Sequence, residues 1–451
     1  MKETDKQTIE FTNPQLRRLI GPLVVEQFLA IMVGLLDSVM VSQVGEAAVS
    51  AVSLVDSVNV MLVFAFGALA TGGAVIVGQY LGRSEGKKAG HAGSQLMLFM
   101  LEVSLAITLV LYLGRTFLLG TVFGKVEPDV AAYANTYYLI TAASTVFLAV
   151  YSAGAALFRV MGNSRISMWV SLLMNVINVG GNALLIFGFR MGVEGVAIPT
   201  LVSRIVAAAA MVLLLNRPGL VLRLERLTLK HDPFVVRYIL RYGVVNGMES
   251  VFFQLGKIVL LSTVSALGTA AVAANAIGNN VACIQNIPGQ AMGMAMVTVV
   301  SQCVGAGDFA KARYYAKKLM RWIYVTFGSV AILVLICLPW ILGLYNVSPE
   351  AEEAAFRIVW LCGVAGIFLW PMSFSLPEAL IAAGDTRYTM VTGTISMWTA
   401  RVGLGLLLAR GCGLGLMGVW YAMVVDWLVR GIAYIIRFRG HRWEEKFIRE
   451  Q

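Results

Sequence analysis

The sequence is poor in charge, in histidine and in cysteine. Charged residues make up 13% of its 451 residues, about half the ~25% typical of soluble domains, which excludes an ordinary soluble enzyme. The three histidines, His91, His231 and His441, lie outside the apolar runs, so no haem, zinc site or proton relay inside an apolar segment can be built on them. The five cysteines show no Cys-x-x-Cys spacing, so we expect neither a disulfide framework nor a metal site.

Apolar residues are abundant and make up 58% of the chain. They form repeated runs of roughly 20 residues, the length at which a helix crosses a ~30 Å hydrocarbon core. We therefore predict an all-α integral membrane protein with twelve transmembrane helices. The predicted spans are 19–42, 49–79, 94–114, 133–157, 168–188, 195–215, 244–264, 272–303, 322–342, 358–380, 391–409 and 415–436.

The basic residues predict the orientation of these spans. With the N-terminus inside, 26 of the 35 Lys and Arg residues fall in cytoplasmic segments and five fall outside. Such an excess places both termini in the cytoplasm. Because the charges are spread over short connections, the net charge of +10 gives no reason to expect a nucleic-acid partner.

The chain is also an internal duplication. Residues 21–100 align without a gap to a segment 223 residues later, so that Glu26 meets Glu249, Gly45 meets Gly268 and Gln79 meets Gln302. Six spans per repeat is an even number, so the repeats are parallel, and such halves enclose a substrate site at their interface. The predicted domains are an N-terminal six-helix lobe (1–215), a cytoplasmic linker (216–243), a C-terminal six-helix lobe (244–436) and a basic cytoplasmic tail (437–451).

Several segments of the chain resemble the multidrug and toxin extrusion (MATE) family, in its DinF-like branch. They are Leu36–Met40, the Gly-Asn/Asp-Ser/Thr-Arg loops at 162–165 and 384–387, and the stretch 178–197. The resemblance implies a MATE-like fold and a proton-coupled antiporter, not an enzyme, in a bacterial-type inner or plasma membrane. The implied substrates are amphipathic or cationic small molecules. We expect a monomer in contact with membrane lipid and no cofactor beyond the H⁺ gradient, with Na⁺ as the alternative coupling ion.

The resemblance also implies an ion-coupling site in the N-terminal lobe. Its expected members are Asp37 as the coupling carboxylate, Asn178, Asn182, Thr200, and Tyr137 or Tyr138. Asn182 stands where many relatives have a second Asp. Pro22 matches the proline at which the first helix bends, and no metal site is expected.

A second group of polar residues lies in predicted spans, where each charge costs roughly 2.5–3.5 kcal/mol on insertion scales. Glu249 and Lys257 are eight residues apart, which places them 80° apart on one broad helix face. With Glu26, at the duplicated position, they are predicted to line the substrate cavity or a gate, or else to be solvated helix ends. Gln254, beside Phe253, occupies the seventh-helix position at which sodium-coupled members have a carboxylate.

Two other functions remain open at this level. A lipid-linked oligosaccharide flippase of the same superfamily requires cations for a pyrophosphate, and Lys257, Arg204 and Arg401 are available. A membrane-embedded enzyme requires a buried nucleophile with its base. We predict that Arg401 and Asp426 form a structural ion pair, and we assign no role to Asp56, Glu102, Arg204 or Glu378.

Overall fold

The computed structural model describes residues 9–122, 127–220, 222, 230–345 and 347–449. Within these residues the chain is helical with no strand, and twelve helices are long and apolar enough to cross a membrane. The prediction of an all-α membrane protein with twelve spans is confirmed. Parts of the predicted linker (221 and 223–229) lie outside the described residues, as does Lys125 in the connection before the fourth span.

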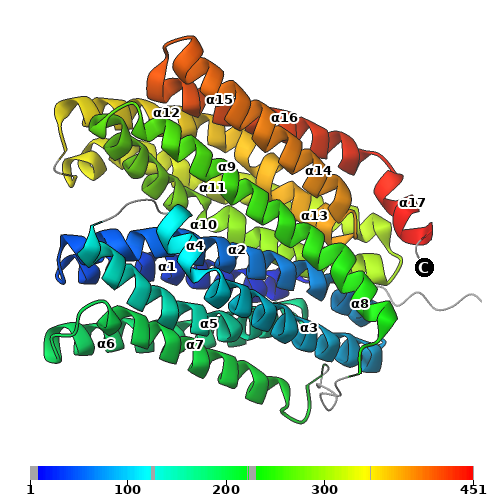
Figure 1. Ribbon diagram of the computed structural model, residues 1–451. Helices are drawn as coiled ribbons and strands as arrows, with labels where there is room; N and C mark the ends of the chain where they lie inside the picture. Colours follow the sequence, from blue (N-terminus) through cyan, green and yellow to red (C-terminus); the bar gives the residue numbers. More distant parts are fainter. Residues whose placement is uncertain (1–8, 123–126, 221, 223–229, 346, 450–451) are drawn as a thin grey trace, which may run out of the picture. The chain divides into compact units, whose positions relative to one another are not determined.

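The chain divides into two compact units, residues 12–247 and residues 248–449 together with 9–11. The first unit (Figure 1, blue to green) contains α1 (Asn13–Ser42), α2 (Glu46–Gly82), α3 (Gly86–Leu113), α4 (Arg115–Phe117), η1 (Leu118–Val122), α5 (Pro128–Val160), α6 (Ser164–Ala183), η2 (Leu184–Gly188), α7 (Glu194–Leu215), α8 (Pro233–Ile239) and η3 (Leu240–Val244), where η denotes a π-helix. Its helices run side by side, with α2 packed mainly on α5 and α5 on α7.

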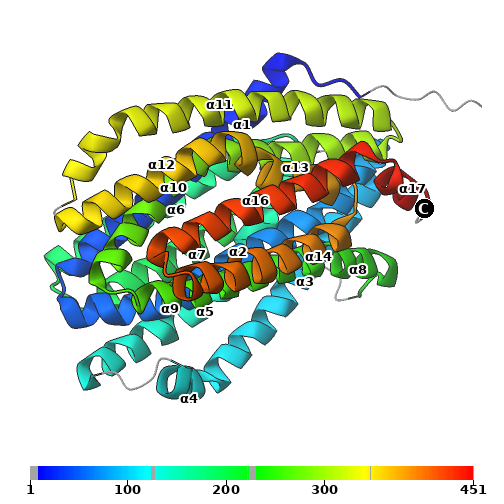
Figure 2. The same ribbon diagram turned by 90° about the horizontal axis from the view of Figure 1, so that it is seen from above.

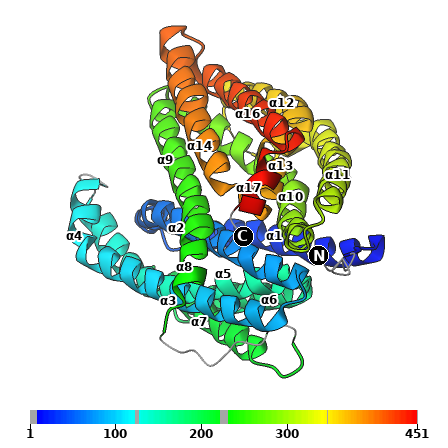
Figure 3. The ribbon, with the colours of Figure 1, turned by 90° about the vertical axis from the view of Figure 1, so that its right-hand side faces the viewer.

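The second unit begins within α9 (Val245–Ser265) and repeats this packing. It contains α10 (Thr269–Gly305), α11 (Phe309–Gly343), α12 (Pro349–Trp370), η4 (Pro371–Ser375), α13 (Leu376–Ala382), α14 (Thr386–Ser396), η5 (Met397–Gly403), α15 (Leu404–Leu406), η6 (Leu407–Gly411), α16 (Gly415–Arg439) and α17 (Arg442–Arg449). α10 packs on α12 and α12 on α16, the pairs that the duplication equates with α2–α5 and α5–α7. Figures 2 and 3 show α9, α14, α16, α12 and α11 following one another around this unit.

Most helices extend beyond the predicted apolar spans. The seventh spanning helix begins at residue 233 instead of 244, the ninth at 309 instead of 322, and the tenth at 349 instead of 358. The added turns contain charged residues, which lower the hydropathy, but their backbone groups still pair along the helix. Residues 233–243 are predicted from the sequence to belong to the linker. In the structure they are helical and continuous with α9.

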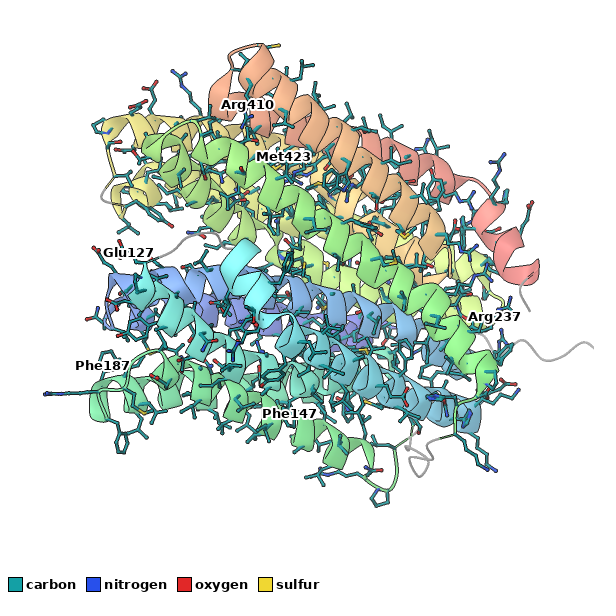
Figure 4. All side chains as sticks on the ribbon, viewed as in Figure 1. Glu127, Phe147, Phe187, Arg237, Arg410 and Met423 are labelled. Carbon is teal, nitrogen blue, oxygen red and sulfur yellow. The ribbon has the colours of Figure 1, made fainter. Side chains whose placement is uncertain are left out.

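Local sequence explains several of these starts. Thr12 caps α1 in a capping box with Gln15, while Asp232 caps α8 and Ser348 caps α12, each directly before a proline. A proline in the first turn costs nothing, because its missing N–H has no partner there anyway. Charged side chains also mark helix ends: Glu127 and Arg237 lie at opposite ends of the first unit (Figure 4).

Candidate functional site

Four of the predicted coupling residues form a hydrogen-bonded chain across three helices of the first unit. Asn182 Nδ2 on α6 donates to Asp37 Oδ1 on α1 at 2.7 Å and lies 3.4 Å from Asn178 Oδ1. Asn178 Nδ2 in turn donates to Thr200 Oγ1 on α7 at 3.0 Å. Asn178 and Asn182 are buried and one helical turn apart, so that α6 presents both amides on one face.

A glycine makes this arrangement possible. A Cβ built on Gly181 would lie 2.7 Å from Cβ of Pro199, which immediately precedes Thr200. Only a residue without a side chain allows α6 and α7 to approach so closely. Gly181 therefore sets the separation at which Asn178 reaches Thr200, although no motif in the sequence had singled it out.

A second carboxylate lies beside this chain of hydrogen bonds. Asp56 on α2 accepts from Tyr137 at 3.0 Å and from Asn59 at 3.1 Å. It interacts electrostatically with Asp37, and Arg204 on α7 interacts with both carboxylates. Sequence reasoning had left Asp56 and Arg204 without a role; the signal was that intramembrane charges are usually found near a partner of opposite sign.

The structure distinguishes the two candidate tyrosines and locates the helix proline. Tyr137 reaches this carboxylate pair through Asp56, and its hydrogen bond goes to Asp56 and not to Asp37. Tyr138 instead donates to the carbonyl of Leu111 on α3. Pro22 lies inside α1, and a bend there stays a prediction.

The surroundings of Glu26 exclude one of its two predicted environments, the solvated helix end. It is 7% exposed, thirteen residues into α1, and Arg159 Nη1 of α5 lies 3.6 Å from its Oε1. Ser167 of α6 donates to Oε2 at 2.8 Å. The alternative of a solvated helix end is therefore wrong for Glu26, which is a buried member of an ion pair.

Glu249, the duplicated residue, is also internal to its helix, sixteen residues from either end of the span Pro233–Ser265. Its Oε1 lies so close to Gly393 of α14 that no Cβ would fit there, and the hydroxyl of Thr389 is within hydrogen-bonding reach. Arg430 is its charged neighbour and Glu378 of α13 a second carboxylate near it. The solvated-end alternative is wrong here as well.

The other predicted cavity residues of α9 differ in exposure, since Gln254 is buried whereas Lys257 is exposed. The predicted pair of Arg401 and Asp426 is confirmed, with Arg401 Nη1 at 3.7 Å from Asp426 Oδ2. Asp426 is shared, because Arg430 Nη2 lies 3.6 Å from its Oδ1, and Ser396 donates to the same oxygen. The described residues contain no group of three or more His, Cys, Asp or Glu side chains arranged to hold a metal ion.

Known proteins agree with this architecture. The family model described as MatE matches residues 22–184 and again residues 247–407, once in each half of the duplication. The chain is 26% identical over 438 residues to the uncharacterised transporter YisQ of Bacillus subtilis, covering 95% of this chain and 94% of that protein. It is 27% identical over 452 residues to the multidrug resistance protein NorM of Burkholderia vietnamiensis, covering 94% and 92%.

Solved structures show the same fold. The outward-facing conformation of a multidrug resistance MATE family transporter of the MOP superfamily matches with a TM-score of 0.89 at 17% identity, covering 96% of each chain. The twofold family match, the twelve spanning helices and the full-length relatives lead to one conclusion: the chain is a multi-pass membrane transporter, not an enzyme, and belongs to the MatE family.

Proposed function

We propose that this transporter is a secondary active multidrug exporter that moves amphipathic or cationic organic compounds outward in exchange for H⁺, with Asp37 as the proton-binding residue. The similarity to NorM multidrug resistance proteins supports the substrate class. The contact that supports Asp37 is its 2.7 Å hydrogen bond to Asn182 inside a chain that also joins α6 to α7.

The hydrogen-bond pattern suits a group that gains and loses a proton. Asp37 accepts from Asn182 Nδ2, as an ionised carboxylate does, while Asn182 Oδ1 is buried without a hydrogen-bond partner among the described residues. When Asp37 becomes protonated, its new O–H needs an acceptor, and an amide that turns over supplies Oδ1. Turning the Asn182 amide changes the hydrogen-bonding group that faces Asn178. The change then passes through Asn178 to Thr200 on α7.

The charges of the site support one proton as the coupling unit. Asp37 and Asp56 together with Arg204 carry one net negative charge when both acids are ionised, and one bound proton makes the group neutral. Neutralisation removes the cost of an unbalanced charge inside the membrane. It shifts the transporter only to the extent that the proton binds one conformation more tightly than the other.

Sodium is the alternative coupling ion. A hard cation takes several oxygen ligands, and Asp37, Asn178, Asn182 and Thr200 contain enough oxygens. In the structure, however, Asn182 directs its Nδ2 at Asp37, and Asn178 directs its Nδ2 at Thr200. Donor groups in these positions favour a proton over a cation at this site.

The remaining features of the proposal follow from sequence. The lobes 1–215 and 244–436, the cytoplasmic linker 216–243 and the cytoplasmic tail 437–451 rest on the duplication and on the 26 to 5 distribution of basic residues. We further propose a monomer in a bacterial-type inner or plasma membrane. Glu26, Glu249, Gln254 and Lys257 are proposed to contribute to substrate recognition or gating, with Pro22 as the point at which α1 bends.

The test is transport of ethidium by proteoliposomes with an imposed pH gradient, an imposed Na⁺ gradient, or neither. We expect transport that depends on the pH gradient. The Asp37→Asn variant should remain monodisperse and bind ethidium but lose gradient-driven transport.

The matched control is Asp129→Asn, which removes an exposed aspartate from the first turn of α5 and should transport normally. Full pH-driven transport by Asp37→Asn would contradict the role of Asp37. Transport that follows the Na⁺ gradient alone would contradict proton coupling.

A further inference from the structure

Three residues form a stripe along α9 in the second unit. Glu249, Phe253 and Lys257 are spaced by four, so they lie above one another on one side of the helix. Lys257 is exposed and eight residues, or about 12 Å, before the end of the helix at Ser265. Because a charged side chain inside an apolar span avoids lipid, this stripe faces a wet or polar region.

The part of α9 that carries Lys257 packs against the π-helix η5. A Cβ on Gly256 would lie 2.5 Å from Cε of Met397 and 3.4 Å from Cγ2 of Val402, so Arg401 is held beside the α9 stripe. Its guanidinium lies 5.3 Å from the ring centroid of Phe253. π-helical segments inside longer helices often occur at functional sites.

Arg401 is buried but poorly satisfied. It is 9% exposed, its Nε is buried without a hydrogen-bond partner, and its contact with Asp426 is 3.7 Å long. No hydrogen bond of its guanidinium to another described residue is found, although the group has five N–H donors. Asp426 does not neutralise it fully, since that carboxylate also pairs with Arg430 at 3.6 Å.

Lys257 adds a second positive charge to the same place. Its charged neighbour is Arg401, and Cys283 of α10 is the other titratable group near it. Within the described part of the chain, no carboxylate lies within 4 Å of its Nζ. Two cations side by side repel each other, and an anion placed between them would relieve this repulsion.

We propose that Lys257 and Arg401 form a subsite for the anionic group of an amphipathic substrate, a carboxylate, sulfonate or phosphate, with Phe253 as the surface for its apolar part. The inference rests on the proposed export function and adds to its substrate class compounds that carry an anion, alone or beside a cation. Arg401 supplies fixed N–H donors, Lys257 supplies a mobile ammonium, and Asp426 with Arg430 holds Arg401 in place. A guanidinium suits such oxygens because its donors form a planar fork.

The test compares two fluorescent probes that differ in one charge, dansylglycine and its neutral amide, dansylglycinamide. Equilibrium binding to the purified full-length protein is measured in nanodiscs of phosphatidylcholine, without any gradient. We expect the wild type to prefer the anion, and Lys257→Met to lower the affinity for dansylglycine about tenfold, as the loss of a charge-assisted contact does. Binding of the amide should not change.

Arg410→Met is the matched control, because Arg410 is an exposed residue near the end of η6 (Figure 4), and should leave both affinities unchanged. Arg401→Lys keeps the positive charge beside Asp426 but loses the planar pair of N–H donors. It should lower the affinity for dansylglycine and leave that for dansylglycinamide unchanged. Equal affinity of the wild type for both probes would overturn the subsite. So would an equal loss for both probes in Lys257→Met.

The anionic group could belong to a lipid headgroup or to a soluble amphiphile. To distinguish the two, the binding is repeated with phosphatidylglycerol in the nanodiscs. Competition with dansylglycine that Lys257→Met abolishes identifies a lipid headgroup as an occupant, whereas no competition identifies a soluble amphiphile. Repeating the binding in Asp37→Asn separates this inference from the coupling role, since the preference for the anion should survive there even if Asp37 proves not to carry the proton.

Discussion

Arg159 lies 3.6 Å from the carboxylate of Glu26 in the first unit, and the two side chains are only 11% and 9% exposed. The duplicated glutamate, Glu249, has Arg430 as its charged neighbour instead. The two repeats thus keep an internal glutamate but neutralise it from different helices, α5 in one and α16 in the other. A hydroxyl from the equivalent helix, Ser167 or Thr389, accompanies each of them.

The pairing predicts a large effect of Arg159→Leu on stability. Removing one partner of a buried ion pair leaves the other charge uncompensated, which costs about 3–5 kcal/mol. We expect a clearly lower Tm for the purified protein. The double variant Glu26→Gln/Arg159→Leu should recover most of the loss. A Tm in Arg159→Leu equal to that of the wild type would show that the pair does not stabilise the fold.

Asn182 connects the coupling carboxylate to the rest of its site, so Asn182→Leu should abolish pH-driven transport of ethidium. The leucine fills the space but donates no hydrogen bond to Asp37 and makes none with Asn178. Asn216→Leu, at the exposed end of α7, is the control and should transport normally. Transport retained in Asn182→Leu would mean that the hydrogen-bonded chain is structural only.

Adjacent glycines on α6 offer a matched test of the close contact with α7. A Cβ on Gly181 would meet Pro199 at 2.7 Å, whereas nothing lies within 4 Å of one on Gly180. Gly181→Ala should destabilise the protein by about 1–3 kcal/mol, as overpacking does, and should slow transport because Asn178 moves away from Thr200. Gly180→Ala should leave the Tm unchanged or raise it, since alanine is the better helix former.

The contact that Glu444 of the C-terminal helix α17 makes with Arg313 and His441 should depend on pH. Trp443 is 1% exposed and stacks on Phe438. Partial burial of Glu444 favours its neutral form, but hydrogen bonds from Arg313 and His441 outweigh this and lower the pKa of Glu444 below its ordinary value. A lowered pKa in the folded state means that the contact stabilises α17 above the unfolded pKa, about 4.3, and loses this effect as the pH falls through the folded pKa.

Hydrogen exchange measures this contact directly. Protection of residues 442–449, corrected for the intrinsic rate, should fall between pH 7 and pH 3 in the wild type. In Glu444→Gln it should be low at both values, while Glu445→Gln, which changes an exposed neighbour, should behave as the wild type. Equal protection at both pH values in the wild type would contradict the prediction.

The orientation is open to a labelling experiment that uses a native residue. Cys412 is exposed in the connection before α16, which the basic residues place outside. A membrane-impermeant maleimide should label it on intact cells, and Cys412→Ser should remove the signal. In that background a cysteine at position 84 should react only after permeabilisation, and one at position 125 should react at once. The reverse pattern would place both termini outside.

Sequence patterns predict part of the candidate site and miss the rest. It grouped Asp37, Asn178, Asn182 and Thr200, and the structure joins these residues by hydrogen bonds. It did not find Asp56, Arg204 or Gly181, because each of them depends on what lies opposite on another helix. It also placed Glu26 and Glu249 near helix ends, since the apolar runs stop at the charged turns that extend α1 and the helix before α9.

The sequence by itself determined the class of protein, the number of spans and the duplication, because apolar length and period are properties of each segment alone. The tertiary structure alone decided which polar groups meet. Asn182 could have faced any of several neighbours, and only the packing of α6 between α1 and α7 brings it to Asp37. The distance between two side chains on different helices depends on how closely their backbones approach, and at Gly181 that approach is set by a contact across helices that no single segment encodes.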